Sequence, residues 1–449
     1  MNTVHLVSLG CAKNLVDSQH VLGALAEAGF QPTEEAASAA VLLVNTCGFL
    51  QAAVEEGIDE ILRLASDKQP EQRLVVFGCL VERYRHELVQ ELPEVDLFCG
   101  VEPYAVIAAE IGALFSGGAQ NRLRNHQRSR LILGQNAVTA CRPPRLLSAP
   151  RHRAYLKITE GCDNRCSYCM IPSIRGPLRS RPLDDLTREA VWLERQGVRE
   201  LSLIAQDLTA YGRDRWNGRS ELTDLLAALT RQTAIPWIRL LYLHPLGVNE
   251  ALLARIAAEP RLLPYLDIPI QHASDRILKA MNRRYDRAHI AKMVGNIRVF
   301  LPDVSLRTTL LIGFPGEEEP DVDEVIELLE ELRFDHVGVF AYSNEQGAPS
   351  EHFPGQCAPV DKARRRDLVM AAQAKISAAR QKSAIGRTFD VLVEGVSAES
   401  DLLLEGRTIY QAPEVDGCVY INEGTASPGD IVRVRIDEAH IYDLVGGIV

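Results

Sequence analysis

The chain has 449 residues, of which 46% are hydrophobic and 24% are charged, and its formal net charge is −11. This composition excludes disordered, collagen-like and coiled-coil proteins, and no apolar run is long enough to span a bilayer. The negative charge disfavours a general binder of nucleic acids or membrane surfaces. We therefore expect a cytoplasmic protein of about three domains that has no membrane partner.

Three strand-like apolar runs near the start of the chain each end on a cysteine and give way to a helical pattern. They cover residues 3–11, 40–47 and 73–79. Alternating strands and helices predict a parallel α/β domain over residues 1–112. The pattern then fails, and residues 113–150 are predicted to form a linker whose arginines, Arg145 among them, are solvated.

Strand-like runs alternate with helical patterns again in a second predicted domain, residues 151–383. The runs cover residues 154–159, 201–205, 237–243, 265–270, 304–312 and 336–342. Six strand–helix units predict a partial (βα)6 barrel, with functional residues at the carboxyl ends of its strands. Over residues 384–449 the apolar period switches to two, and five short strands predict a small antiparallel β-barrel of the oligonucleotide-binding (OB) type.

The strongest chemical signal is a C-x3-C-x2-C cluster directly after the first strand of the second domain. It consists of Cys162, Cys166 and Cys169, here called the second trio. Three thiolates suit an iron–sulfur cluster that keeps one iron open for a small molecule. Structural zinc needs four closed ligands, and no paired motif supplies a fourth. Zinc binding or inert buried thiols are the alternatives.

A second constellation comes from the three strand ends of the first domain. It consists of Cys11, Cys47 and Cys79, here called the first trio. The carboxyl ends of parallel strands lie on one edge of a sheet, so three loops could bring these thiols to a second cluster. Free cysteines are also often buried for packing alone, which is the alternative. The other cysteines, Cys99, Cys141, Cys357 and Cys418, fit no site.

Together these features resemble a known family. The second trio is similar to the motif of the radical S-adenosylmethionine (SAM) enzymes, and the first trio and the terminal barrel narrow the resemblance to the methylthiotransferases. The segments that carry it are VSLGCAKNLVDS, NTCGF, EGCDNRCSYCMIPSIRGPLRSRP, IAQDLTAYGRD, LYLHPLG, YLDIPIQHASDRILKAMNRR and GRTFDVLVEG. Within the family they resemble the enzymes that methylthiolate an aspartate of small-subunit ribosomal protein twelve.

The resemblance implies two [4Fe-4S] clusters and SAM as cofactors, and a TRAM-like terminal barrel. At the second trio, the open iron would hold SAM, whose one-electron cleavage gives a radical that removes hydrogen from the β-carbon of the target aspartate. At the first trio, the cluster would hold the inserted sulfur, and a second SAM would provide the methyl group. The protein positions these groups and excludes water.

The resemblance also implies residues that contact SAM at the strand ends and inside the cysteine motif. These are Tyr168, Gln206, Asp207, Arg307, Gly313 and Gly316. A scaffold role is the alternative for each of them. The sequence assigns no residue to catalysis itself.

The implied partners are the basic ribosomal protein, free or within the ribosome, an electron donor and a sulfur donor, and we expect a monomer. Residues 384–449 hold four basic and twelve acidic residues, a net charge of −8. This charge would steer a basic protein and oppose transfer RNA, unless it serves only solubility. The same chemistry on a transfer RNA adenosine, and a non-catalytic iron–sulfur or zinc-binding protein, are the alternative functions.

Overall fold

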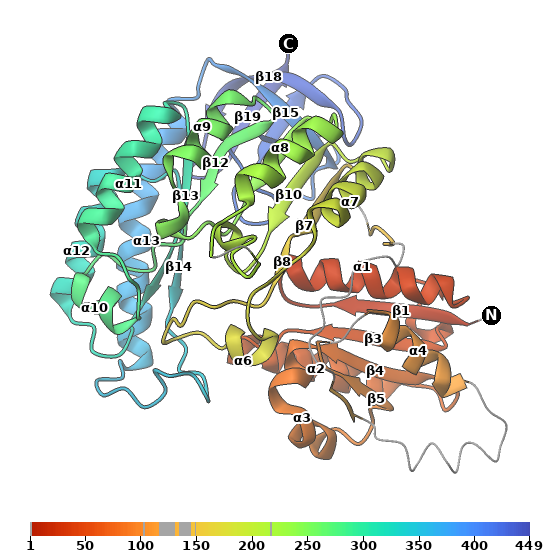
Figure 1. Cartoon of the computed structure of the whole chain (residues 1–449). Helices are drawn as coiled ribbons and strands as arrows, with labels where there is room; N and C mark the ends of the chain where they lie inside the picture. Colours follow the sequence, from red (N-terminus) through yellow and green to blue (C-terminus); the bar gives the residue numbers. More distant parts are fainter. Residues whose placement is uncertain (1, 102–103, 116–130, 134–144, 149, 216–217) are drawn as a thin grey trace.

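The computed structural model describes residues 2–101, 104–115, 131–133, 145–148, 150–215 and 218–449. Its strands form two six-stranded sheets, a closed barrel and one two-stranded ribbon. Figure 1 shows the first sheet, coloured red to orange, on one side of the second sheet, with the C-terminal barrel in blue at the far end. Among the described residues, no helix combines the length and the apolarity that crossing a membrane requires.

The first sheet is parallel, with strand order β2-β1-β3-β4-β5-β6. Its strands are β1 (Thr3–Ser8), β2 (Gln31–Pro32), β3 (Val41–Thr46), β4 (Arg73–Gly78), β5 (Leu97–Cys99) and β6 (Leu131–Ile132). The helices around it are α1 (Ala12–Glu27), η1 (Ala36–Ser38), α2 (Gln51–Asp67), α3 (Cys79–Glu91) and α4 (Tyr104–Phe115). Helices cover both faces, so the central strand β3 is buried along its whole length and reads as a continuous apolar run.

Two findings correct the predicted linker. Leu131 and Ile132 pair with β5 and extend the first sheet, because a strand of two residues is too short to leave a periodic signal. Arg145 is buried rather than solvated, and its guanidinium donates to Glu189 at 2.8 Å and to the carbonyl oxygen of Tyr155 at 2.7 Å. Other parts of the predicted linker, including Cys141, lie outside the described residues.

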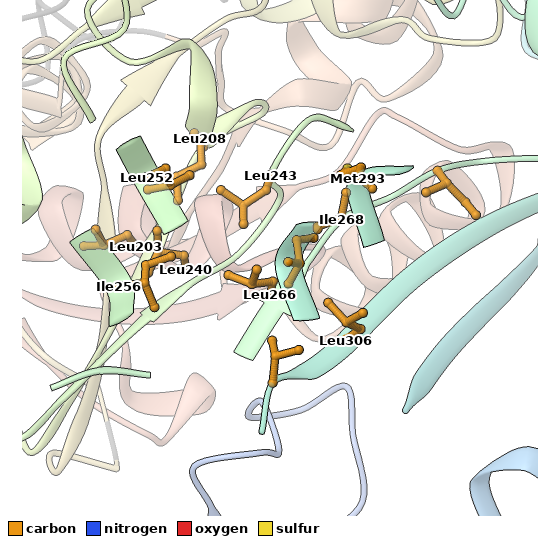
Figure 2. Close-up of a cluster of buried hydrophobic side chains, with 14 of the residues drawn as sticks. Leu203, Leu208, Leu240, Leu243, Leu252, Ile256, Leu266, Ile268, Met293 and Leu306 are labelled. Carbon is orange, nitrogen blue, oxygen red and sulfur yellow. The ribbon is translucent and has the colours of Figure 1, made fainter. Parts of the chain in front are cut away.

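The second sheet contains the six strands predicted for the partial barrel, all parallel, in the order β14-β13-β12-β11-β10-β7. Its strands are β7 (Arg153–Lys157), β10 (Glu200–Ile204), β11 (Trp237–Leu240), β12 (Leu262–Asp267), β13 (Ser305–Ile312) and β14 (His336–Ala341). The helices are α6 (Ile171–Arg175), α7 (Leu183–Arg195), η2 (Leu208–Ala210), α8 (Leu222–Gln232), η3 (Pro245–Gly247), α9 (Glu250–Ala258), α10 (Asp275–Ala280), α11 (Arg287–Phe300), α12 (Glu319–Leu332) and α13 (Pro359–Lys382). Leucine and isoleucine side chains of these strands and helices pack against one another in the core between the sheet and its helices (Figure 2).

The C-terminal strands close into the predicted barrel, in the order β15-β16-β17-β19-β18. They are β15 (Thr388–Val396), β16 (Leu404–Thr408), β17 (Val419–Glu423), β18 (Ile431–Ala439) and β19 (Leu444–Ile448). Four of the pairings are antiparallel and one, β17 with β19, is parallel. The parallel pairing closes the barrel, and full closure removes exposed sheet edges.

Buried ion pairs join this barrel to the amino ends of the second sheet. Glu200, the first residue of β10, accepts from Arg239 at 2.6 Å and from Arg407 of the barrel, also at 2.6 Å. All three side chains are almost inaccessible to solvent. The opposite, carboxyl edge of the sheet is therefore left for the cysteine loops.

Candidate functional site

The first trio comes together at the carboxyl edge of the first sheet. Cys11 precedes α1, Cys47 follows β3, and Cys79 opens α3. The sulfur atoms of Cys11 and Cys79 both lie 3.9 Å from the side-chain oxygen of Asn14. A Cβ added at Gly10 would lie only 2.8 Å from the Cβ of Cys47, so the loops that carry Cys11 and Cys47 are also in contact. Three loops that are distant in sequence thus meet, as topology predicted.

The second trio lies on a single loop between β8 (Thr159–Glu160) and α6. The ribbon of β8 with β9 (Arg179–Ser180) closes the base of this loop. Inside it, the backbone N–H of Cys169 donates to the carbonyl oxygen of Cys166 at 3.1 Å. The N–H of Cys162 donates to the carbonyl oxygen of Gly176, also at 3.1 Å. The loop is therefore fixed at both ends before any cofactor is considered.

Burial disfavours the ionised form of most cysteine thiols in the two trios. Burial raises the pKa of Cys79 and of Cys169 to about 12, and that of Cys162 to about 11. Desolvation also opposes ionisation of Cys11, but the charges of Lys13 and Arg175 outweigh it and lower the pKa of Cys11. Buried thiols of this kind lose their protons when a cationic centre binds them.

The donor set fits an iron–sulfur cluster. Each trio offers three soft sulfur ligands, which is the ligand type that such clusters take. Within the described residues, no three cysteine, histidine, aspartate or glutamate side chains converge on a point where one metal ion could sit. A four-iron cluster takes each thiolate on a different iron, so it requires no such convergence.

The two trios are joined through α6. This helix directly follows the second trio, and its last residue, Arg175, donates to the sulfur of Cys79 at 3.2 Å. Apolar side chains close the same junction: Cys79 packs against Met170 and Ile174, with Ala348 and Phe49 beside them. Figure 1 shows α6 (yellow) beside α3, between the two sheets. The cysteine trios therefore belong to one continuous site.

A cation–π contact also joins the first and second domains at this edge. The ammonium group of Lys13, two residues after Cys11, lies 3.6 Å from the ring centroid of Tyr242, which follows β11. Tyr242 has a φ of 63°, a backbone conformation that is strained for a residue with a side chain. Its N–H donates to Asp267 at 3.0 Å, which helps to hold that conformation.

Three residues predicted to contact SAM lie near the second trio. Asp207 follows β10 and accepts from Asn164 of the cysteine loop at 2.9 Å. Its neighbour Gln206 donates to Glu160 at 3.4 Å, while its side-chain oxygen has no hydrogen-bond partner among the described residues. Tyr168 packs in an apolar cluster with Phe314. Their contact with SAM stays a prediction.

The three other predicted contacts already have partners within the protein. Arg307 lies in the amino-terminal half of β13, away from the strand end where the site lies. It pairs with Asp267 at 3.1 Å and with Asp416 of the C-terminal barrel at 3.4 Å. The N–H of Gly313 donates to Glu317, also on this turn. The N–H of Gly316 donates to the carbonyl oxygen of Gly355 at 2.8 Å. These contacts fit scaffold roles, and a role in binding SAM stays a prediction for all three residues.

Comparison with known proteins identifies the family. The sequence profile described as "Uncharacterized protein family UPF0004" matches residues 3–100, that of the Radical SAM superfamily matches residues 156–329, and that of the TRAM domain matches residues 385–449. The chain is 53% identical to the ribosomal protein uS12 methylthiotransferase RimO of Desulfotalea psychrophila, over 99% of both chains. It is 46% identical to the protein of the same name from Geobacter sulfurreducens, over 99% of this chain and 98% of that one.

The chain belongs to the ribosomal protein uS12 methylthiotransferase family. The resemblance drawn from the motifs is confirmed, and the chain is a radical SAM methylthiotransferase that uses SAM and an iron–sulfur cofactor.

Solved structures share the fold of this methylthiotransferase. The methyltransferase TsrM from Kitasatospora setae aligns with a TM-score of 0.57 at 15% identity, over 78% of this chain and 77% of that one. The cobalamin-dependent enzyme OxsB aligns with a TM-score of 0.51 at 10% identity, over 84% of this chain and 58% of that one. Both are SAM radical enzymes, and likeness at these identities shows the fold alone.

The polar residues that hold the methylthiotransferase site together were not predicted from the sequence. Asn14 and Arg175 contact the first trio, and Arg283 donates to the sulfur of Cys166 at 3.1 Å. Asn14 and Arg175 both stand inside the motif segments, three residues after Cys11 and six after Cys169. Their place in the motifs was a usable signal. Arg283 also stands in a motif segment, YLDIPIQHASDRILKAMNRR, but it lies more than a hundred residues from Cys166 and only the fold brings the two together.

Proposed function

We propose that the enzyme transfers a methylthio group to the β-carbon of an aspartate in ribosomal protein uS12, with one [4Fe-4S] cluster on each cysteine trio. The observation that carries the proposal is the link between the loops of the two trios: Arg175, at the end of the short helix that follows Cys169, donates to the sulfur of Cys79. A radical formed at one trio and sulfur held at the other could then reach the same substrate carbon. The full-length similarity to uS12 methylthiotransferases supports this choice of substrate.

The bound cofactors would supply the electron transfer, the radical and the methyl group that no side chain of this chain can supply. In the net reaction the aspartate loses one hydrogen atom to 5′-deoxyadenosine and gains a methylthio group. Its sulfur comes from a donor at the oxidation level of sulfide and its methyl group from a second SAM. The electrons would balance, because cleavage of the first SAM would take up one electron and formation of the carbon–sulfur bond would release one.

The protein's own groups would position these reactants and keep water away. Met170 and Ile174 pack against Cys79 and form an apolar wall between the trios. Gln206 and Asp207, which lie next to the cysteine loop, are the best placed of the predicted SAM contacts, together with Tyr168. Arg307, Gly313 and Gly316 would act less directly, by shaping the strand ends.

We propose the following division of labour along the chain. Residues 1–112 would hold the sulfur-donating cluster, residues 151–383 would cleave SAM, and residues 384–449 would bind the basic substrate through their net charge of −8. An electron donor and a sulfur donor would act on a monomeric enzyme. Eight of the twelve carboxylates of the C-terminal barrel are exposed: Asp390, Glu399, Asp401, Glu414, Glu423, Asp430, Asp437 and Glu438.

The test uses the full chain, reconstituted with iron and sulfide without oxygen, and mixed with SAM, a reductant and purified uS12. Mass spectrometry should find one methylthio group on an aspartate of uS12, and Cys166→Ala should give none. Unmodified uS12 together with methylthiolated adenosine in transfer RNA would contradict the proposed substrate.

A further inference from the structure

Each cysteine trio has one arginine whose guanidinium donates to a cysteine sulfur. In the first trio, Arg175 donates to Cys79 at 3.2 Å. In the second trio, Arg283 donates to Cys166 at 3.1 Å. Among the described residues, neither arginine donates a hydrogen bond to a sulfur of the other trio. The two contacts are alike in chemistry and come from different parts of the fold.

Arg175 is held rigidly in its place. Its side chain is 2% exposed, and one nitrogen donates to Asp17 at 3.2 Å and to Glu160 at 2.9 Å. Another nitrogen donates at 2.8 Å to the oxygen of Asn14 that also faces the sulfurs of Cys11 and Cys79. Lys157 pairs with the same two carboxylates. Arg175 thus shares two carboxylates with Lys157, and it acts on Cys79 both through its nearby charge and through an oriented N–H group.

Arg283 is held by neutral oxygen atoms. It donates to the hydroxyl of Tyr285 at 2.6 Å and to the carbonyl oxygen of Pro269 at 3.1 Å. Among the described residues, the ionisable groups that face it include the tyrosines Tyr168 and Tyr285 and the thiol of Cys166, and no carboxylate pairs with it. Its positive charge therefore acts on the second trio without compensation, in addition to the N–H that points at Cys166.

We propose that Arg175 and Arg283 are positioning residues that each raise the reduction potential of one iron–sulfur centre, Arg175 at the first trio and Arg283 at the second. The inference rests on the proposed function, because it needs a centre at each trio. Hydrogen bonds to the ligand sulfurs and nearby positive charge stabilise the more negative, reduced form of a cluster. Separate arginines let the enzyme set the two potentials independently, so that the SAM-cleaving centre and the sulfur-holding centre need not share one value.

The structure also provides a matched control, Arg83. Its side chain is 5% exposed and also joins the first domain to the radical SAM core, through Glu345 at 2.9 Å. It donates to the carbonyl oxygen of Gly48, next to Cys47, but has no hydrogen bond to a sulfur in the described part of the chain. Its replacement by lysine tests what loss of a buried arginine does near the first trio without loss of an N–H···S contact.

The experiment compares Arg175→Lys, Arg283→Lys and Arg83→Lys in the full chain, reconstituted without oxygen. Iron analysis first establishes how many centres each protein holds, and redox titration followed by electron paramagnetic resonance gives the midpoint of each centre. Single-centre versions, made with Cys162→Ala or Cys47→Ala, assign each signal to its trio. Arg175→Gln is the second variant if Arg175→Lys does not accumulate as folded protein.

We expect Arg175→Lys to move only the first centre to a more negative potential, and Arg283→Lys to move only the second. Arg83→Lys should move neither. If wild type holds two centres and the arginine variants leave both midpoints unchanged, or if Arg83→Lys shifts the first centre as much as Arg175→Lys, the inference is wrong and the proposed function stands. If wild type holds iron for one centre only, the two-cluster proposal fails and the inference fails with it.

Discussion

The two cysteine trios reach similar surroundings by opposite routes. The second trio stands within eight residues of one loop, whose ends are pinned by the β8–β9 ribbon. The first trio is assembled from three loops, so that Cys11, Cys47 and Cys79 meet only when β1, β3 and β4 pair in register. A local site is encoded by spacing, while an assembled site depends on the tertiary structure. The first trio should therefore be the more easily disturbed of the two.

The largest expected effect separates the tasks of the trios. Cys166→Ala should abolish both SAM cleavage and methylthio transfer, whereas Cys47→Ala should keep cleavage and lose only transfer. Chromatography of 5′-deoxyadenosine and mass spectrometry of uS12 measure the two activities. If Cys47→Ala lost cleavage as well, while the protein remained folded, the division of tasks would be wrong.

A second prediction concerns a support that lies far from both trios. Glu200→Gln removes the carboxylate shared by Arg239 and Arg407, and breaking a buried ion pair from one side costs about 3–5 kcal/mol. Chemical denaturation should show this loss in the transition of the C-terminal barrel, while iron loading of both trios stays as in wild type. Loss of iron would show that the two ends of the second sheet are coupled.

Low pH should destabilise the protein at the same ion pairs, by protonating Glu200. Burial opposes ionisation of Glu200, but Arg407 and Arg239 outweigh it and lower its pKa to about 2. A carboxyl whose pKa is lower in the folded state adds stability above its unfolded pKa, about 4.3, and that stability is lost as the pH falls toward 2. The loss should reach about 3 kcal/mol, and Glu200→Gln should flatten the pH profile of unfolding. An equally steep profile in the variant would contradict this assignment.

The glycine before each trio gives a matched pair of smaller perturbations. Gly10 has a φ of 92° and Gly161 a φ of 70°, and alanine in such a conformation costs about 1–3 kcal/mol. A Cβ would also meet Cys47 at Gly10, and the carbonyl oxygen of Pro177 at Gly161. Gly10→Ala should lower iron loading of the first trio only, and Gly161→Ala that of the second only. If each variant lowered the iron loading of both trios equally, the two trios would not be separate sites with separate supports.

The smallest effect concerns substrate binding by the acidic barrel. The affinity for uS12 should fall several-fold as the ionic strength rises from about 0.05 M to about 0.5 M, because the Debye length shrinks over that range. Titration by fluorescence anisotropy at several salt concentrations measures it. If the affinity for uS12 does not depend on salt, the negative charge of residues 384–449 does not steer the substrate and serves solubility only.

The strand-like and helical runs predicted the architecture because the spacing of apolar residues is a local property of the sequence. The six parallel strands of the second sheet were predicted within a few residues, and the five strands of the C-terminal barrel were predicted in number, although as antiparallel throughout, whereas β17 and β19 pair in parallel. The strand Leu131–Ile132 was not predicted, because two residues carry no period. Nor was the burial of Arg145, since the partners that neutralise it, such as Glu189, are distant in sequence.

The cysteines of the site could be predicted because spacing and strand ends are local properties of the sequence. The side chains that contact these cysteines could not be predicted in that way. Spacing identified Cys162, Cys166 and Cys169, and the position of each strand end identified the first trio. Arg283 became part of the site only through its contact with Cys166 in the folded chain. For Arg307, the apolar run predicted the strand on which it lies, β13, but not its pairing with Asp416 of another domain.

The most direct test of a site built from two trios is the iron and sulfide content of the full chain, reconstituted without oxygen, with Mössbauer spectroscopy of the same samples. Wild type should hold two [4Fe-4S] clusters per chain, and Cys47→Ala and Cys166→Ala should each hold one. A single cluster in wild type that survives Cys47→Ala, or zinc in place of iron at either trio, would contradict the account.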